Sequence, residues 1–108
     1  NELNLTKPNV RSMWFQYQSK AQHVQEHTDP PLGNSTAEQS FTSILYMHDT
    51  WEENYKGEIV FSKDEGTFLP KPNRLLIYSR DEAHRVNEIT HDLEGYQRML
   101  FFIGWGTE

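Results

Sequence analysis

The sequence predicts an all-β fold, either a sandwich or a barrel of short strands. Segments rich in β-branched and aromatic residues recur roughly every ten residues, and turn-forming residues separate them. No segment has the 3.6-residue periodicity of a convincing amphipathic helix. The chain contains neither a long internal repeat nor a low-complexity stretch, and its 108 residues suit one domain. We therefore expect residues 1–108 to form a single domain of seven or eight strands.

Runs of β-forming residues define the individual strands. In chain order the expected strands cover residues 13–18, 22–27, 41–47, 57–61, 74–78, 84–89 and 96–103. The first alternates Met, Phe and Tyr on one face with Trp and two Gln on the other, which is the two-residue period of a strand. The segment 74–78 is the most continuous apolar run, so we expect it to be the most buried strand.

Polar and breaker-rich segments connect these strands. Residues 1–12 are mostly polar and include a proline, so we expect a lead-in segment before a core that covers 13–105. The loop at 30–36 holds two prolines and a glycine, and we place it at the rim of any site. Residues 68–73 also contain two prolines, which fits a sheet edge or a connection and not a central strand.

Composition narrows the class of protein. The net charge of −6 argues against non-specific nucleic-acid binding, which depends on Lys and Arg neutralising phosphates. The chain has no cysteine, so it can build neither a disulfide nor a thiolate zinc site. No apolar run approaches the roughly 18 residues of a membrane span, and the N-terminus lacks a signal-peptide core. We expect a soluble, cytoplasmic protein with no membrane partner.

The first candidate site is the motif His27-x-Asp29. Residues two apart on an extended segment point to the same face, so this pair supplies two ligands on one side of a metal. His84, on a distant strand, is placed to supply the third. Two histidines and one carboxylate form the facial triad of non-haem Fe(II) oxygenases, although a solvated surface pair is the simpler interpretation of the motif alone.

Arg98 is the second candidate, since it lies in the last strand on the same face as Leu100 and Phe102. An arginine among inward-facing apolar neighbours is costly unless it meets an anion. That anion is either a bound ligand or a carboxylate of the chain such as Glu88. The remaining histidines are expected at the surface; they are His23, His48 and His91.

Several motifs in a fixed order resemble a known family. In chain order they are His27-x-Asp29, residues 46–51, Gly57-Glu58, residues 70–76, His84-x-Val86, and Arg98 followed by Trp105. Together they resemble the core of the 2-oxoglutarate and Fe(II) dependent dioxygenases, and they are most similar to the prolyl 4-hydroxylases. The similarity covers residues 13–105 and implies a double-stranded β-helix, or jelly roll.

The resemblance also implies roles for single residues. His27, Asp29 and His84 match the catalytic iron ligands of that family. Arg98 and Tyr46 match the residues that bind the distal carboxylate of 2-oxoglutarate, and Tyr17 matches a tyrosine that lines the cosubstrate pocket in some relatives. The implied cofactors are Fe(II), 2-oxoglutarate and O₂, with ascorbate as an optional addition.

Two features depart from the family pattern. The separation of His84 and Arg98 is longer than usual, which implies a loop insertion within residues 90–95. The helices that normally precede the core and buttress its outer sheet have no counterpart in these residues. The chain is then either a minimal or truncated member, or a partner supplies the support.

Three functions are compatible with this pattern. The first is hydroxylation of a prolyl or similar side chain of a protein or peptide. The second is the same chemistry on a small molecule or sugar; the nucleic-acid repair branch carries a further Arg that residues 99–106 lack. The third is a jelly-roll binding or structural module without turnover. The sequence does not define the oligomeric state.

Overall fold

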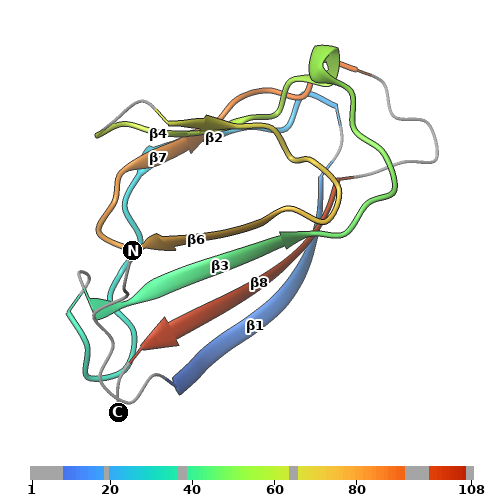
Figure 1. Ribbon diagram of the computed structural model, residues 1–108. Coiled ribbons are helices and arrows are strands. Elements are labelled where there is room, and N and C mark those ends of the chain that lie inside the picture. Colours follow the sequence, from blue (N-terminus) through green and yellow to red (C-terminus); the bar gives the residue numbers. More distant parts are fainter. Residues whose placement is uncertain (1–8, 19, 37–38, 64–65, 92–97, 107–108) are drawn as a thin grey trace.

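The computed structural model describes residues 9–18, 20–36, 39–63, 66–91 and 98–106 (Figure 1). Most of their regular structure is β-strand, as the sequence predicts, and a short 3-10 helix adds to it. The elements are β1 (Asn9–Gln18), β2 (Val24–His27), β3 (Phe41–Tyr46), η2 (Glu53–Tyr55), β4 (Ile59–Phe61), β5 (Thr67–Phe68), β6 (Leu75–Ser79), β7 (His84–Val86) and β8 (Arg98–Gly106). No helix in this described part of the chain has the length and apolar character needed to cross a membrane.

The strands form two facing antiparallel sheets. One sheet has the order β1-β8-β3-β6 and the other the order β2-β7-β4-β5. Figure 1 shows them as two layers, with β2, β7 and β4 above β6, β3, β8 and β1. The chain crosses repeatedly from one layer to the other, which is the pattern of a jelly roll. The predicted all-β jelly roll is confirmed.

The core lies between the two layers. Both sheets contribute to it: Ile44, Tyr46, Tyr78 and Leu100 come from the first sheet, and Ile59 and Phe61 from the second. Each strand sends alternate side chains inward, so the residues of β3 and β8 that face the core are spaced two apart. Apolar burial between the layers is thus the main stabilising contribution.

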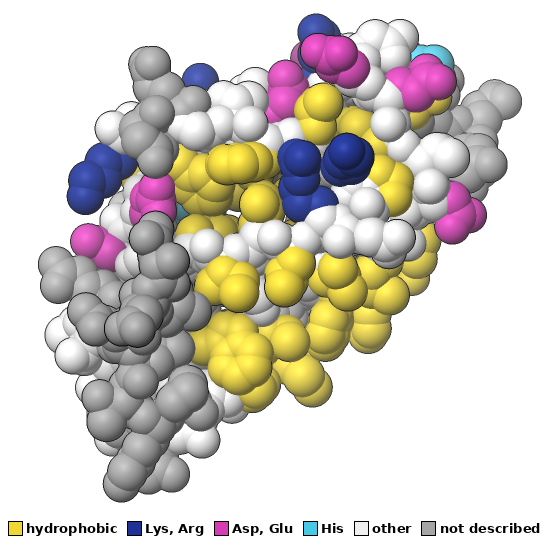
Figure 2. Space-filling view, viewed as in Figure 1, with side chains coloured by type: hydrophobic (Ala, Val, Ile, Leu, Met, Phe, Trp, Pro, Cys, Tyr) yellow, Lys and Arg dark blue, Asp and Glu magenta, His cyan; other side chains and the backbone are white. Residues whose placement is uncertain are grey.

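The strand β6 is not the most buried strand, contrary to the sequence-based expectation. It lies at the edge of its sheet, and its outward side chains Leu75 and Ile77 are 57% and 49% exposed. A continuous apolar run predicts burial on both faces of a strand, but only one face of β6 meets the core. Apolar side chains gather over the part of the molecule where this sheet lies (Figure 2).

Some boundaries also differ from the expectation. The strand β1 begins at Asn9, within the expected lead-in segment, because the long strand β8 offers partners as far as Gly106. The strand β7 ends at Val86, and Ile89 instead forms an isolated bridge with Lys56. Residues 1–8 of the lead-in and residues 92–97, which include most of the expected insertion, lie outside the described residues.

Candidate metal centre

The two histidines meet because β2 and β7 are neighbours. Their antiparallel register puts His27 opposite His84, and the centroids of the two imidazole rings are 4.4 Å apart. His84 is buried, whereas the side chain of His27 is 38% exposed. The pair therefore stands where the cavity between the sheets opens.

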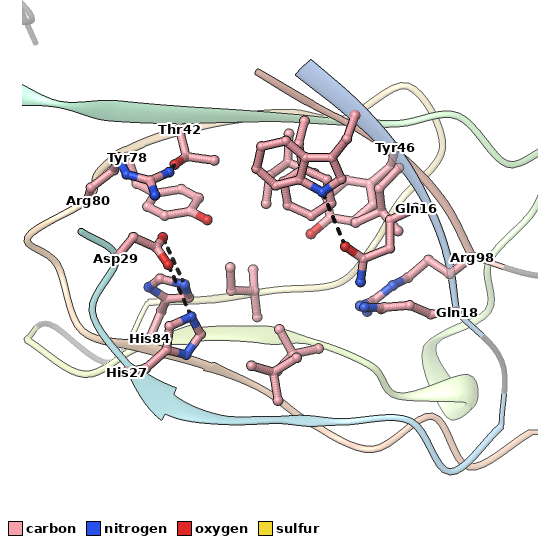
Figure 3. Close-up of a pocket in the computed structure, with 17 residues that line it drawn as sticks. Gln16, Gln18, His27, Asp29, Thr42, Tyr46, Tyr78, Arg80, His84 and Arg98 are labelled. Carbon is pink, nitrogen blue, oxygen red and sulfur yellow. Dashed lines mark hydrogen bonds and ion pairs between the residues drawn. The ribbon is translucent and has the colours of Figure 1, made fainter. Parts of the chain in front are cut away.

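Asp29 completes the group just beyond the end of β2. Its Oδ1 lies 3.3 Å from Nε2 of His27, and its Oδ2 lies 3.7 Å from Nε2 of His84 (Figure 3). One ligand atom from each of the three residues lies within 4.8 Å of the others, so the group can hold a metal ion. The sequence prediction of this triad agrees with the geometry.

Main-chain carbonyls set the tautomers of both histidines. Nδ1 of His27 lies 2.8 Å from the carbonyl oxygen of Gln25, and Nδ1 of His84 lies 2.9 Å from that of Glu82. A carbonyl only accepts hydrogen bonds, so each Nδ1 carries the proton and donates it. Each Nε2 then keeps its lone pair toward Asp29, which is the arrangement that metal-binding histidines require.

A cavity of about 310 Å³ extends from this triad between the two sheets. Arg98 and Tyr46 line it on the far side from His27 and His84 (Figure 3). This volume is near the lower end of the range for small-ligand sites, which runs from roughly 300 to 1,000 Å³. The cavity therefore suits a small organic ligand that reaches from the triad to Arg98.

Arg98 is buried at the inner end of this cavity, only 2% exposed. Its Nη1 donates to the carbonyl oxygen of Gly57 at 2.7 Å, but its buried Nε has no hydrogen-bond partner. Burial lowers the pKa of Arg98 to about 10, while the phenol of Tyr46 opposes that shift, so the side chain stays charged at neutral pH. Within the described residues no ion pair joins Arg98 to a carboxylate, and Glu88 is exposed.

Gly57 makes room for this guanidinium. Its φ of +77° lies in the left-handed region, which disfavours residues with a Cβ. A Cβ built there would stand 3.1 Å from Cγ1 of Ile89 and 3.3 Å from Nη1 of Arg98. The backbone at Gly57 therefore passes close to Arg98, and it brings a carbonyl within reach of the guanidinium.

Of the two tyrosines expected at the cosubstrate site, Tyr46 is buried and Tyr17 is exposed. Tyr46 is 2% exposed and lines the cavity near Arg98, and burial raises its pKa, so its hydroxyl remains a donor. Tyr17 is 56% exposed and does not line the cavity, so its expected place in a cosubstrate pocket is wrong. Because side chains alternate along β1, its neighbours Gln16 and Gln18 face the cavity instead.

Sequence reasoning also missed buried polar residues. His48 was expected at the surface, but it is 5% exposed and hydrogen-bonded at both ring nitrogens. Thr42, Tyr78 and Arg80 line the cavity and were not singled out. The two-residue period was the available signal, since Thr42 lies four residues before Tyr46 on the same strand face.

The family model described as "2OG-Fe(II) oxygenase superfamily" matches residues 12–105, which is most of the chain. The chain belongs to the 2OG-Fe(II) oxygenase superfamily. A search of curated proteins gives no match.

Solved structures agree with this superfamily fold. A 2OG-Fe(II) oxygenase family oxidoreductase from Burkholderia pseudomallei gives a TM-score of 0.72 at 14% identity, over 93% of this chain and 45% of that one. A prolyl-4-hydroxylase from Pseudomonas putida gives a TM-score of 0.67 at 18% identity, over 89% of this chain and 51% of that one. Apo HygX from Streptomyces hygroscopicus gives a TM-score of 0.73 at 7% identity, over 94% of this chain and 59% of that one. At such identities the likeness shows the fold alone, and the alignments cover about half the length of these proteins.

The residues present fit the iron and the cosubstrate for which the superfamily is named. Two imidazole nitrogens and a carboxylate on one side of a metal suit Fe(II) and leave other coordination positions open. The unpartnered Nε of Arg98 is a buried donor that a carboxylate would satisfy. The cavity thus offers a metal-binding group and an anion-binding group.

Proposed function

We propose that this chain is an Fe(II)- and 2-oxoglutarate-dependent dioxygenase that hydroxylates a prolyl or similar side chain of a protein or peptide in the cytoplasm. The observation that carries the proposal is one cavity with a His-Asp-His group at one side and an unpaired buried arginine at the other. Membership of the superfamily supports the same chemistry.

Nε2 of His27, Nε2 of His84 and the carboxylate of Asp29 would hold the iron. When bound, iron supplies the coupled reaction in which 2-oxoglutarate, O₂ and a substrate C–H group become succinate, CO₂ and a C–OH group. The protein's part is to keep both Nε2 atoms deprotonated, which the Nδ1–H bonds to main-chain carbonyls achieve without any change in charge.

Arg98 would bind the distal carboxylate of 2-oxoglutarate through its guanidinium. Burial removes competing water, so the charge-assisted hydrogen bonds are stronger than they would be at a surface. The hydroxyl of Tyr46, kept protonated by its raised pKa, would donate to the same carboxylate. Together they would orient the cosubstrate toward the triad and hold it there before reaction.

The choice of a peptide substrate rests on two supports. One of the similar structures is a prolyl-4-hydroxylase, although at 18% identity. The cavity of about 310 Å³ leaves little room beyond a small cosubstrate, which suits one protruding side chain better than a large metabolite. The loop that begins at Pro30 borders Asp29 and would contact the rest of a bound peptide.

The test is iron-dependent succinate production in the presence of a peptide library. We expect Pro-containing peptides to stimulate turnover and to gain one oxygen atom by mass spectrometry. The doubly substituted His27→Ala, His84→Ala protein should lose both stoichiometric iron binding under anaerobic conditions and all turnover. Oxidation of a free metabolite with no peptide product would assign the small-molecule function. If no substrate led to succinate, the remaining function would be the third one, a binding or structural module without turnover.

A further inference from the structure

Arg80 is a buried cation on the metal side of the cavity that neither the triad nor the cosubstrate site uses. It follows directly on β6, is 8% exposed, and lines the cavity beside Thr42 and Tyr78 (Figure 3). Among the described residues no carboxylate forms an ion pair with it. Its guanidinium donates instead to neutral oxygen atoms, and one of them belongs to the segment that carries Asp29.

The segment from Asp29 to Pro31 has little backbone support of its own. It follows the end of β2 and belongs to no strand. Pro30 and Pro31 have no N–H group, so Asp29 holds the only main-chain donor in the segment. That donor bonds to the carbonyl oxygen of Arg80 at 2.9 Å. The backbone of the carboxylate ligand is therefore held by residue 80.

The side chain of Arg80 also binds this segment, in addition to its main-chain carbonyl. Its Nε donates to the carbonyl oxygen of Pro30 at 2.7 Å, and its Nη1 donates to Oγ1 of Thr42 at 2.9 Å. Thr42 lies on β3, near the middle of the first sheet, whereas Asp29 follows a strand of the second. The rigid fork of the guanidinium thus ties the metal-ligand segment to the opposite sheet.

We propose that Arg80 is a positioning residue that fixes the carboxylate of Asp29 opposite the two Nε2 atoms, an inference that rests on the proposed metal site. The N–H of Asp29 and the carbonyl of the following residue, Pro30, are both bound by this single arginine. Residues that orient metal ligands in this way typically contribute a factor of roughly 10 to 100 in metal affinity.

The arrangement requires arginine and not another cation. Lysine could place one charge in the same space, but its single ammonium cannot present two donors in a plane to Pro30 and Thr42. Neither acceptor is charged, so Coulomb attraction to a partner does not account for the burial of Arg80. The contacts of its backbone and side chain with the Asp29 segment account for that burial.

The experiment measures Mn(II) affinity by calorimetry and the melting temperature of the metal-free protein, for wild type and three variants. Arg80→Lys removes the fork, and Thr42→Val removes one acceptor while keeping the shape of the side chain. Arg74→Lys is the matched control, because Nη1 of Arg74 also donates to a main-chain carbonyl, that of Leu69, away from the triad. We expect Arg80→Lys to weaken Mn(II) binding about tenfold or more and Thr42→Val to weaken it less. Arg74→Lys should leave it unchanged.

A second titration separates this role from others. With Mn(II) saturating, 2-oxoglutarate affinity in Thr42→Val and Arg80→Lys should stay close to that of wild type. Unchanged Mn(II) affinity in both variants, with only a lower melting temperature, would make Arg80 a purely structural residue and overturn the proposal. A loss of 2-oxoglutarate affinity without a loss of metal affinity would overturn it too, in favour of an anion site. Failure of the wild type to bind Mn(II) would instead refute the proposed function.

Discussion

At the scale of single residues, His48 shows how one buried imidazole joins three segments. It follows β3, its Nε2–H donates to the carbonyl oxygen of Pro70, and its Nδ1 accepts the N–H of Met99 at 3.2 Å. Met99 is next to Arg98, so His48 also helps to fix the start of β8. Both contacts need the neutral ring, and burial lowers the pKa of His48, with the nearby charge of Arg98 acting in the same direction.

This lowered pKa predicts how stability depends on pH. The unfolded chain takes up a proton at the ordinary histidine pKa of about 6.5, before the folded protein does, so the free energy of unfolding should fall as pH drops below that value. Replacing His48 with Gln should remove part of that fall and cost about 1–3 kcal/mol at pH 7.5 through poorer partners for buried groups. Urea unfolding of both metal-free proteins at pH 7.5 and 5.5 checks this. Equal pH dependence in the two proteins would contradict it.

Gly57 gives a second prediction at this scale. Ala at this position would take a φ of +77° and push against Ile89 and the guanidinium of Arg98. We expect Gly57→Ala to lower stability by more than about 1 kcal/mol and to weaken 2-oxoglutarate binding, while Mn(II) affinity stays unchanged. Thermal melts and calorimetry of the variant test this. Unchanged 2-oxoglutarate affinity would contradict the prediction, because it would show that the backbone next to Arg98 tolerates a methyl group.

The sequence allowed some of these residues to be predicted and not others. His27, Asp29 and His84 could be found because the triad has a short spacing and a chemical rule for its members. Arg98 could be found because a charge between apolar residues of a strand needs a partner. Tyr17 was misplaced because alternation defines two faces but does not say which one is inward. His48 was missed because its partners, Pro70 and Met99, are distant in the sequence.

At the scale of elements, the outer face of the first sheet is apolar across all four strands. The register aligns Phe15 of β1 with Phe101 of β8, Phe101 with Leu45 of β3, and Leu45 with Leu75 of β6. Phe15 and Leu75 at the ends of this row are 62% and 57% exposed. Contiguous apolar patches of this kind usually mark contact surfaces. The expectation that the chain is a minimal or truncated member, or that a partner supplies the support of the outer sheet, stays a prediction.

This row predicts self-association in dilute buffer. Changing Phe15 and Leu75 to Ser should reduce concentration-dependent association and the binding of a hydrophobic dye. The change removes the two exposed apolar side chains at the ends of this row. Metal affinity should not change, since neither residue lines the cavity. Sedimentation velocity over a range of concentrations measures the association. Identical sedimentation of variant and wild type would contradict the expectation.

Strand positions could be predicted more closely than strand environments. Local β-forming runs located β3 and β6 to within one residue at each end. The pairing order, which puts β6 at an edge and β8 between β1 and β3, depends on contacts far apart in the sequence. That order decides which apolar face is covered, so the burial of β6 could not be inferred from its composition.

At the scale of the whole molecule, the jelly roll holds the two halves of the site on different elements. The pair β2 and β7 carries the histidines, whereas β8 and β3 carry Arg98 and Tyr46 from the facing sheet. Strand patterning alone predicted a sandwich or barrel, and only the family resemblance predicted this topology. The central claim is that the cavity between the sheets binds 2-oxoglutarate between metal and arginine.

The most direct measurement is calorimetric titration of 2-oxoglutarate into the Mn(II)-loaded wild type and Arg98→Ala, with thermal melts of both. Hydrogen bonds to a charged group contribute roughly 1.5–3 kcal/mol, so affinity should fall about tenfold to a few hundredfold in Arg98→Ala. Arg98→Lys should recover only part of the loss, and Mn(II) affinity should barely change in either variant. If Arg98→Ala melts at a lower temperature but its folded fraction binds 2-oxoglutarate as wild type does, Arg98 is structural and the central claim is wrong.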